Sequence, residues 1–368
     1  MHGMKRWRAA MRQALYAPGG FFVSGPGPAA HFRTSSLASA FFADALLRVL
    51  ENLDAALGRP RVLQVVEVGA GRAELLRTLA ERASPELVGR LQLTAVELAP
   101  PPFTDSTPAR PGEVPSGGAG PRCAIDWCAE APSHVTGLLL AAEWLDNVPL
   151  DLVETDQSGR RRVVLVDGSG SERLGEAPTG DDAAWLDRWW PADPSFEPDG
   201  EPGARAEIGW PRDDAWARAV RTLDRGLALA IDYGHVSGVR PAGGTLTGYR
   251  HGRQVTPTPD GTCDLTAHVA IDAVAAAGES ATGSPSQLLD QRTALHALGI
   301  SGARPSRQLA VTDPAGYVRQ LAAASEAAEL TDRRGLGAHY WLLQPVGMPE
   351  KWRATRPDMT SQARRRRA

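Results

Sequence analysis

The sequence predicts an α/β protein in which helices pack on both faces of a mostly parallel, twisted β-sheet. Three observations lead to this fold. Short apolar runs alternate with amphipathic stretches along the chain, several of these runs have no polar face, and the first of them ends in a glycine-rich turn that leads into a helix. Strand–helix–strand connections of this kind are right-handed and give a parallel sheet.

The apolar runs place the strands, and helical periodicity places the helices between them. The predicted strands are 62–68, 91–97, 137–142 and 227–231. The predicted helices are 4–16, 36–57, 73–83 and 213–223. An almost continuous apolar run such as 62–68 is typical of a parallel strand that is buried on both faces.

Three stretches interrupt this alternation. Residues 99–121 are rich in proline and glycine and are expected to form an exposed loop. Residues 156–206 combine a hairpin around Arg161–Val166 with an acidic segment that contains Trp189 and Trp190, which we interpret as an insertion beside the sheet. The predicted domains are therefore a helical cap with a substrate-side loop, 1–57, and a sheet domain, 58–347, followed by a disordered tail, 348–368.

The composition excludes several classes of protein. The net charge is -3 and the pI about 6.3, so a nucleic-acid partner is not indicated. The basic run Arg364–Arg367 is interpreted as a solvated end of the chain. Three cysteines, Cys123, Cys128 and Cys263, build neither a disulfide framework nor a zinc site. No apolar run is long enough to span a bilayer, and we expect a cytoplasmic protein without a metal.

The turn after the first strand carries the pattern of a nucleotide site. Gly69, Ala70 and Gly71 let the backbone approach a ligand closely at the start of a helix, and Glu67 precedes them. Glu74 stands where a dinucleotide site has a third small residue, and its charge would repel a pyrophosphate. S-adenosylmethionine (SAM) has no phosphate and carries a sulfonium and an ammonium, which suit Glu67. The pattern therefore favours SAM over NAD, with a simple tight turn as the remaining alternative.

Two neighbouring strand ends complete the predicted cofactor site. Glu97 ends the second strand, where a carboxylate can accept hydrogen bonds from both ribose hydroxyls. Asp126 and Trp127 are candidates for the adenine end, although a large aromatic at a strand end is often part of the core.

Several segments in order along the chain resemble one family, the MidA-like SAM-dependent methyltransferases. The segments are ALYAPGGFF (14–22), HFRTSSLAS (31–39), EVGAGRAEL (67–75), AAEWLDNVPLDLVE (141–154), AIDYGH (230–235), GTLTGYRHGR (244–253) and DLTAHV (264–269). The resemblance implies a Rossmann-like methyltransferase fold with SAM as cofactor. The family includes a mitochondrial complex I assembly factor that methylates arginine on a protein, so it also implies a protein substrate of the respiratory-complex type.

This sequence departs from the family pattern at its N-terminal loop. Ala30-His31-Phe32 replaces Gly-Asp-Phe, Ser36-Leu37 replaces Pro-Glu, and Ala142 stands where the family has asparagine. Two acidic positions are lost, which leaves open a different substrate or weakened catalysis.

Four residues are the candidates for the chemistry. Methylation of arginine needs carboxylates that grip a protonated guanidinium and accept a proton. Glu143 and Asp146 follow the strand 137–142, at the carboxyl edge where ligands bind in α/β sheets, and are the candidate substrate carboxylates. Asp232 and Tyr233 end the strand 227–231 and are expected to shape the pocket.

Structural roles remain open for the same residues. Asp146 and the Asp232–Tyr233 pair could instead form turns, and His268 is either a pocket residue or a core histidine. Three other functions also remain open: methylation of a small molecule, a SAM-binding but catalytically weakened assembly factor that acts by binding a protein, and an NAD-dependent oxidoreductase.

Overall fold

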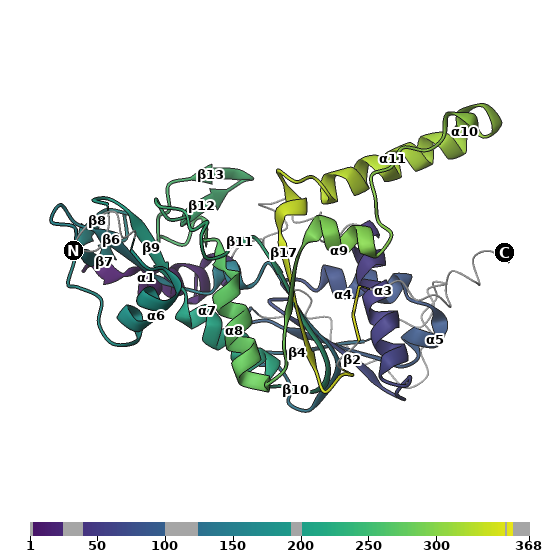
Figure 1. The fold of residues 1–368 in the computed structure, drawn as a ribbon, viewed down its shortest axis with the longest axis horizontal. Helices are drawn as coiled ribbons and strands as arrows, with labels where there is room; N and C mark the ends of the chain where they lie inside the picture. The colour runs from purple at the N-terminus through teal and green to yellow at the C-terminus, as the bar shows by residue number, and fades with distance from the viewer. Residues whose placement is uncertain (1–2, 25–39, 100–123, 193–200, 350–351, 356–368) are drawn as a thin grey trace.

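A seven-stranded sheet forms the centre of the molecule in the computed structural model, which describes residues 3–24, 40–99, 124–192, 201–349 and 352–355 (Figure 1). The strands, in spatial order, are β16 (Gln287–Asp290), β17 (Tyr340–Val346), β10 (Leu223–Asp232), β5 (Val135–Ala142), β2 (Leu63–Val68), β3 (Leu91–Val96) and β4 (Ile125–Cys128). The five strands from β10 to β4 are parallel, and β17 runs antiparallel to both of its neighbours. The predicted mostly parallel sheet is confirmed.

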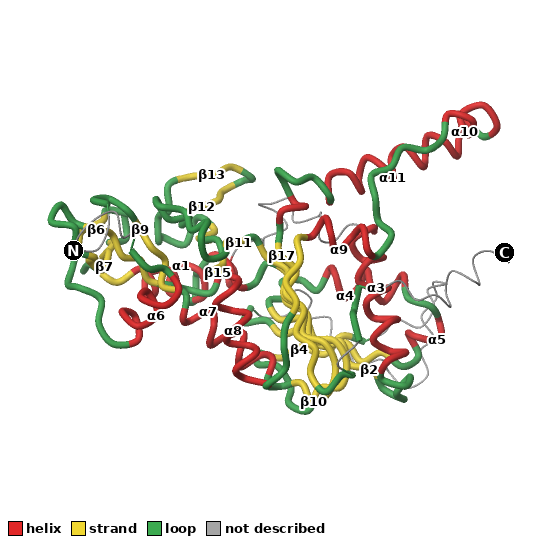
Figure 2. The backbone as a smooth tube through the Cα atoms, in the orientation of Figure 1, coloured by secondary structure: helices red, strands yellow, loops and turns green. Residues whose placement is uncertain are grey.

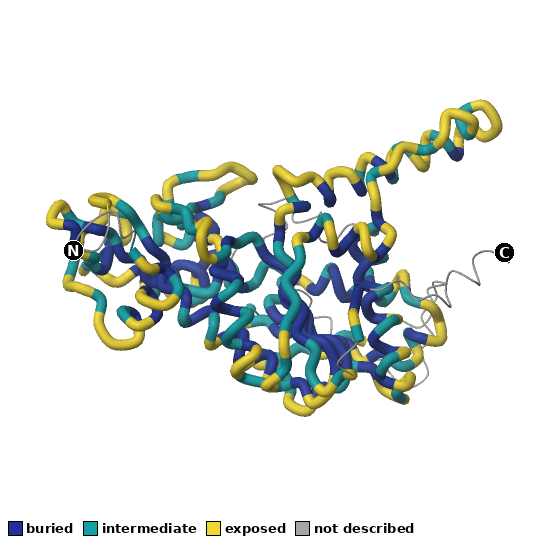
Figure 3. Tube along the Cα trace, viewed as in Figure 1, coloured by how far each residue is buried: buried dark blue, intermediate teal, exposed yellow. Residues whose placement is uncertain are grey.

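Helices cover both faces of this sheet (Figure 2). On one face lie α3 (Ala40–Ala56), α4 (Glu74–Arg82), α5 (Pro85–Val88) and α9 (Gln291–Ala297); on the other lie α7 (Trp210–Val220) and α8 (Ile271–Thr282). Residues alternate between the faces, so that Leu138 and Leu140 pack toward α3 while Leu139 and Ala141 pack toward α7. The central strands are buried along most of their length (Figure 3).

The strands inserted between β5 and α7 form a second, smaller sheet together with a strand from the N-terminal segment. It contains β1 (Lys5–Arg6), β7 (Arg161–Val166), β6 (Asp151–Thr155) and β9 (Arg205–Ile208), with β8 (Glu172–Leu174) paired to β7. One side packs on α1 (Trp7–Tyr16) and the other on α6 (Asp181–Trp189). The inserted strands thus extend a few residues beyond the predicted insertion, and Trp190 belongs to their core.

The N-terminal helices pack on different sheets. Helix α1 packs on the small sheet, α2 (Phe21–Ser24) follows it, and α3 packs on the large sheet. The altered loop positions 30–32 and 36–37 lie outside the described residues, as do most of the predicted loop 99–121 and most of the tail. The division into cap, sheet domain and tail stays a prediction.

Short elements join the two sheets at the carboxyl edge of β5 and β10. They are η3 (Leu145–Asn147), the parallel pair β11 (Gly234–His235) and β15 (Val269–Ala270), and a three-stranded sheet of β12 (Thr247–Arg250), β13 (Arg253–Val255) and β14 (Asp264–Thr266). Helices α10 (Arg307–Thr312) and α11 (Pro314–Leu330) project from the body and return through η4 (Leu336–Ala338) to β17 (Figure 1). None of the described helices has the length and apolar character required to cross a bilayer.

Two glycines allow the central strands to approach each other closely. Gly226 in β10 pairs with Gly137 in β5, which in turn pairs with Gln64 in β2. A Cβ on Gly226 would lie 1.9 Å from the carbonyl oxygen of Gly137, and a Cβ on Gly137 would lie 2.0 Å from that of Gln64. Side chains are therefore excluded at both positions.

We predict that Gly226→Ala lowers the free energy of unfolding by about 3 kcal/mol or more, because the backbone of a central strand must move to admit the methyl group. Urea denaturation followed by circular dichroism measures the change. The control is Gly168→Ala, where a Cβ would meet no atom within 4 Å, and its effect should stay within about 0.5 kcal/mol. Equal effects of the two substitutions would contradict the steric explanation.

Candidate functional site

The glycine turn after β2 is shaped by positive backbone angles and by a tryptophan packed against it. Gly69 and Gly71 have φ of +72° and +53°, and helix α4 begins three residues later at Glu74. A Cβ on Gly69 would lie 2.7 Å from the Trp144 ring, whereas a Cβ on Gly71 would meet nothing within 4 Å. Ala70 is buried in the core. The turn therefore presents open backbone at Gly71 and lies directly beside the segment that follows β5.

Glu97 is brought to this turn as the sequence predicts. Its Oε2 accepts a hydrogen bond of 2.9 Å from the backbone N–H of Gly71. Its Oε1 accepts from the N–H groups of Leu98 and Ala99 at 2.7 and 3.2 Å. These bonds fix the carboxylate at the mouth of the turn.

Glu67 lies beneath the same turn and is almost completely buried, at 5% exposure. Its Oε2 has no hydrogen-bond partner among the described residues. Burial, followed by the charges of Glu74 and Glu97, raises the pKa of Glu67 to about 8. A buried carboxyl with a free oxygen beside an open backbone turn is a place where a cationic ligand group is stabilised.

Asp126 and Trp127 lie on β4, the strand next to β3. Asp126 is exposed, while Trp127 is half-buried and packs against the core on the α3 side. The N–H of Glu97 donates to the carbonyl of Cys128 at 2.9 Å, which ties this strand to the acidic residue of the turn. The packing of Trp127 agrees with the core alternative, and both residues stay candidates for the adenine end.

The four predicted catalytic residues meet at the carboxyl ends of β5 and β10. The Oδ2 atom of Asp232 accepts from the N–H groups of Leu145 and Asp146 at 3.0 and 3.3 Å. The Oδ2 atom of Asp146 accepts from the hydroxyl of Tyr233 and, at 2.6 Å, from that of Thr266. The carboxyl of Glu143 lies at the same edge, with φ of +48° at the residue itself. Asp146 and Asp232 thus have turn-stabilising contacts and still belong to one side-chain cluster.

Asp264 joins this cluster from β14, and the burial of so many carboxyls weakens their acidity. Burial and the neighbouring carboxylates raise the pKa of Glu143 and of Asp264 to about 8 each. Burial also raises the pKa of Asp146 and that of Asp232. The Oδ1 atoms of Asp146 and Asp232 have no partner among the described residues. The cluster therefore has the capacity to bind a cation with several N–H donors.

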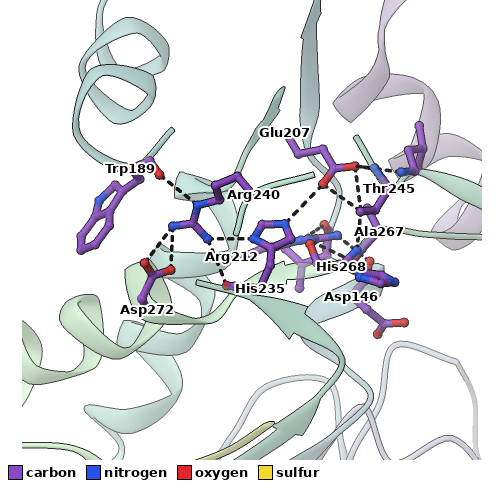
Figure 4. A network of polar contacts seen from close by, with 12 residues as sticks. Asp146, Trp189, Glu207, Arg212, His235, Arg240, Thr245, Ala267, His268 and Asp272 are labelled. Carbon is purple, nitrogen blue, oxygen red and sulfur yellow. Dashed lines mark hydrogen bonds and ion pairs between the residues drawn. The ribbon is translucent and has the colours of Figure 1, made fainter. Parts of the chain in front are cut away.

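One buried arginine holds the segments that carry these carboxyls. Arg212 of α7 is 1% exposed and donates to the backbone carbonyls of Asp146 and Val148 in the segment after β5. It also donates to those of Ala267 and His268, at 3.0 and 2.9 Å (Figure 4). The guanidinium thus clamps together the segment after β5 and the connection between β14 and β15.

Glu207 from the small sheet extends this network. It accepts hydrogen bonds from the hydroxyl of Thr245, at 2.9 Å, and from its backbone N–H. Beyond it, Arg240 donates to the carbonyl of His235 and to both carboxylate oxygens of Asp272 (Figure 4). The polar network therefore connects the small sheet to the site.

Several of these residues were missed by sequence reasoning. Tyr16 of α1 donates through its hydroxyl to the carbonyl of Asn147 at 3.1 Å, and Asn147 donates to Asp264 at 2.8 Å. Tyr16 and Asp264 belong to segments that carry the family resemblance, which was the available signal. Arg212 gave no signal, because it lies one residue before the predicted helix 213–223 although α7 includes it.

Two histidines flank Tyr233. The ring centroid of His268 lies 5.2 Å from that of Tyr233, and that of His339 lies 5.5 Å away. His268 is exposed at the residue level, so it is not a core histidine. His339 is nearly buried and was not anticipated.

The comparisons with known proteins point to one cofactor. The family model described as S-adenosyl-L-methionine-dependent methyltransferase matches residues 43–288. A crystal structure from Burkholderia thailandensis bound to S-adenosylhomocysteine is 25% identical, covers 94% of this chain and 89% of its own, and superposes with a TM-score of 0.72. A second crystal structure from that organism gives 25% identity, coverages of 97% and 91%, and a TM-score of 0.72. No curated protein sequence matches.

We predict that stability falls as the pH rises from about 4.5 to 8, in part because of Glu67. A carboxyl whose pKa is raised from 4.5 to about 8 by folding contributes stability that is complete below the lower value and is lost as the pH approaches the upper one. The slope for one such group is at most about 1.4 kcal/mol per pH unit. Glu67→Gln should remove that part of the slope.

The measurement is the free energy of unfolding in urea at pH 5 and pH 8. Glu81→Gln is the control, because Glu81 is an exposed residue of α4 and should leave the slope of the wild type unchanged. A Glu67→Gln slope equal to that of the wild type would show that Glu67 is already ionised at neutral pH.

Proposed function

Because the chain belongs to the family of S-adenosyl-L-methionine-dependent methyltransferases, whose model it matches over residues 43–288, we propose that it methylates a guanidinium nitrogen of arginine in a protein substrate. Its cofactor is SAM. The observation that carries the proposal is the cluster of carboxyls beside the glycine turn, formed by Glu143 together with the buried Asp146, Asp232 and Asp264.

The residues of the turn fit this cofactor. Open backbone at Gly71 and the sharp turn at Gly69-Ala70 suit the close approach of the amino-acid part. Glu67, with its free buried oxygen, suits the positively charged groups. Glu97 would accept hydrogen bonds from the ribose hydroxyls, and Asp126 and Trp127 would border the adenine. When bound, SAM supplies an electrophilic methyl group on sulfur.

The carboxyl cluster suits a guanidinium better than a neutral acceptor. A guanidinium keeps its proton at physiological pH and presents five N–H donors, so a site for it needs several acceptors. Glu143 and Asp146 would hold it, and Asp232 and Tyr233 would fix Asp146 and its segment in place. Binding of a cation favours the ionised carboxylates, whose pKa values are raised while the cluster is uncompensated.

The proposed reaction places the proton as well as the methyl group. The lone pair of the acceptor nitrogen forms the new N–CH3 bond, the electrons of the S–CH3 bond remain on sulfur, and the nitrogen loses a proton. Glu143 is the proposed acceptor of that proton, because its raised pKa makes it a better base than an ordinary carboxylate.

The protein nature of the substrate is supported by the resemblance to the MidA-like family, in which an assembly factor methylates arginine. A respiratory-complex subunit is the kind of partner that this resemblance suggests. Departures at Ala30-His31 and Ser36-Leu37 keep two alternatives: a small-molecule acceptor, and a SAM-binding assembly factor with weakened catalysis.

We predict that Glu97→Ala weakens the binding of S-adenosylhomocysteine by about 10- to 100-fold, because up to two charge-assisted hydrogen bonds are lost. Isothermal titration calorimetry gives the dissociation constants. Glu81→Ala on α4 is the control and should bind as the wild type does. Unchanged affinity of Glu97→Ala would remove this residue from the proposed ribose site.

We predict that Glu143→Gln reduces methyl transfer at least about 100-fold, since the proton acceptor is lost, while S-adenosylhomocysteine affinity stays within about twofold. The assay incubates the enzyme with methyl-labelled SAM and a cell lysate and identifies labelled residues by mass spectrometry. Asp224→Asn is the matched control, because Asp224 lies near the opposite end of β10.

The products separate the alternatives. Methylarginine in protein supports the proposal. Label in small molecules alone contradicts the protein substrate, and cofactor binding without any labelled product would favour the assembly-factor alternative.

A further inference from the structure

Glu143 and His339 approach each other at the site from opposite sides of β10. Glu143 directly follows β5, His339 directly precedes β17, and these two strands flank β10 in the sheet. Because β17 is antiparallel, it starts at the edge where β5 ends. The Nδ1 atom of His339 lies 3.8 Å from Oε1 of Glu143.

The pair is held by its backbones, and no side chain among the described residues other than the two partners themselves forms a hydrogen bond or ion pair with either group. The N–H of Glu143 donates to the carbonyl of Ile231 at 2.8 Å, and the carbonyl of His339 accepts from the N–H of Gln291 at 2.7 Å. Within the described part of the chain, Nδ1 of His339 is buried without a hydrogen-bond partner. A shift of about 1 Å at the flexible end of Glu143 would close the contact to a normal hydrogen bond.

The groups around this pair set its charge. Glu143 faces the carboxyls of Asp146, Asp232 and Asp264. His339 faces the ring of Tyr233 and lies near His268. Burial, and then His268, lowers the pKa of His339 to about 4, whereas that of Glu143 is raised to about 8. Near neutral pH one proton therefore resides on the carboxyl, and the imidazole is neutral.

We propose that His339 is the positioning residue of Glu143: its Nδ1 accepts a hydrogen bond from the protonated carboxyl, donates one to the ionised carboxylate, and takes up the carboxyl proton so that Glu143 can accept the proton of the methyl acceptor. This inference rests on the proposed function for the last step alone. The hydrogen bond between Glu143 and His339 can be tested on the protein with bound cofactor product alone, whatever the methyl acceptor is.

The proton path is balanced. The O–H bond of Glu143 breaks as the Nδ1–H bond of His339 forms, and the imidazolium gives up its Nε2 proton to water, which leaves an ionised Glu143 beside Nδ1–H. As the N–CH3 bond forms, the acceptor nitrogen loses its proton to this carboxylate. Water then returns a proton to Nε2 and removes the one on Nδ1, so that both groups regain their starting state. The pKa values of Glu143 and His339 disfavour proton transfer from the carboxyl to the imidazole by a factor of roughly 10⁴. Such a transfer can still occur about 10⁸ times per second. This greatly exceeds typical turnover of about 1–10³ per second.

The first test needs no acceptor. Nitrogen-15 NMR of histidine-labelled protein, saturated with S-adenosylhomocysteine, follows the tautomer of His339 from pH 6 to 9.5, and the His339→Gln protein assigns its signal. We expect the proton to move from Nε2 to Nδ1 with a midpoint near the pKa of Glu143, about 8. In Glu143→Gln the imidazole should keep its Nε2 proton throughout, because the amide donates at every pH.

His268 is the matched control, since it also packs against Tyr233 but has no ion pair or hydrogen bond with Glu143. Its tautomer should not follow the same midpoint. A single tautomer of His339 over the whole range in the wild-type protein overturns the proposal, and so does an identical change in Glu143→Gln.

The second test is a double-mutant cycle with the methyl acceptor that labelling identifies. His339→Gln should lower kcat by about tenfold or more and leave KM for SAM within about twofold. In the Glu143→Gln background it should cost nothing further, because His339 acts through Glu143. The cost of His268→Ala, whatever its size, should persist in full in that background.

The two tests fail separately. If the decreases in kcat caused by His339→Gln and by Glu143→Gln multiply fully in the double variant, the proposed proton path is wrong. If no arginine is labelled, the proposed function fails, and the NMR titration alone decides whether the pair exists.

Discussion

The buried guanidinium of Arg212 is the interaction on which the arrangement of the site depends. It satisfies backbone carbonyls from two separate segments, and its charge faces Glu207, Asp146 and Asp232 in an environment from which water is excluded. An unpaired buried charge is strongly destabilising, so the guanidinium and its carboxylates require one another. The segment after β5 and the connection from β14 to β15 therefore form one unit around Arg212.

The site is also shaped by contact between the glycine turn after β2 and the carboxyl-bearing segment after β5. Gly69 must lack a side chain because Trp144 packs on it, and Trp144 lies between Glu143 and the start of η3. The cofactor turn and the carboxyl segment are thus in van der Waals contact. A reaction that moves a methyl group over a short distance requires this proximity, because positioning supplies much of its rate.

The sequence was sufficient for the large parallel strands and for the glycine turn that follows the first of them. Strands buried on both faces leave apolar runs, and a turn that needs positive φ leaves glycines, so both can be recognised locally. Strand β17 was not recognised, because Gln344 and Pro345 interrupt its apolar run. Gln344 is fully buried and donates to the carbonyl of Ser284, a contact that no local pattern reveals.

The acceptor side was predictable only in part for the same reason. Glu143, Asp146, Asp232 and Tyr233 lie at strand ends or within four residues of them, so their place at one sheet edge could be inferred from topology. Tyr16, Arg212 and His339 reach the same place from a distant helix, a covering helix and an antiparallel strand. Their roles depend on long-range packing, which one sequence does not display.

The pairing of β1 with β7 has a consequence for how the chain reaches its native state. Lys5 pairs with Val166 and Arg6 with Leu165, so β7 is joined by a strand that lies about 160 residues before it in the chain. Contacts so distant in sequence are costly to form early, because a long loop must close first. During synthesis the N-terminal segment emerges long before its partner strand exists. Its apolar residues Trp7, Met11 and Leu15 must therefore wait, exposed to water and to other chains, until β7 has left the ribosome.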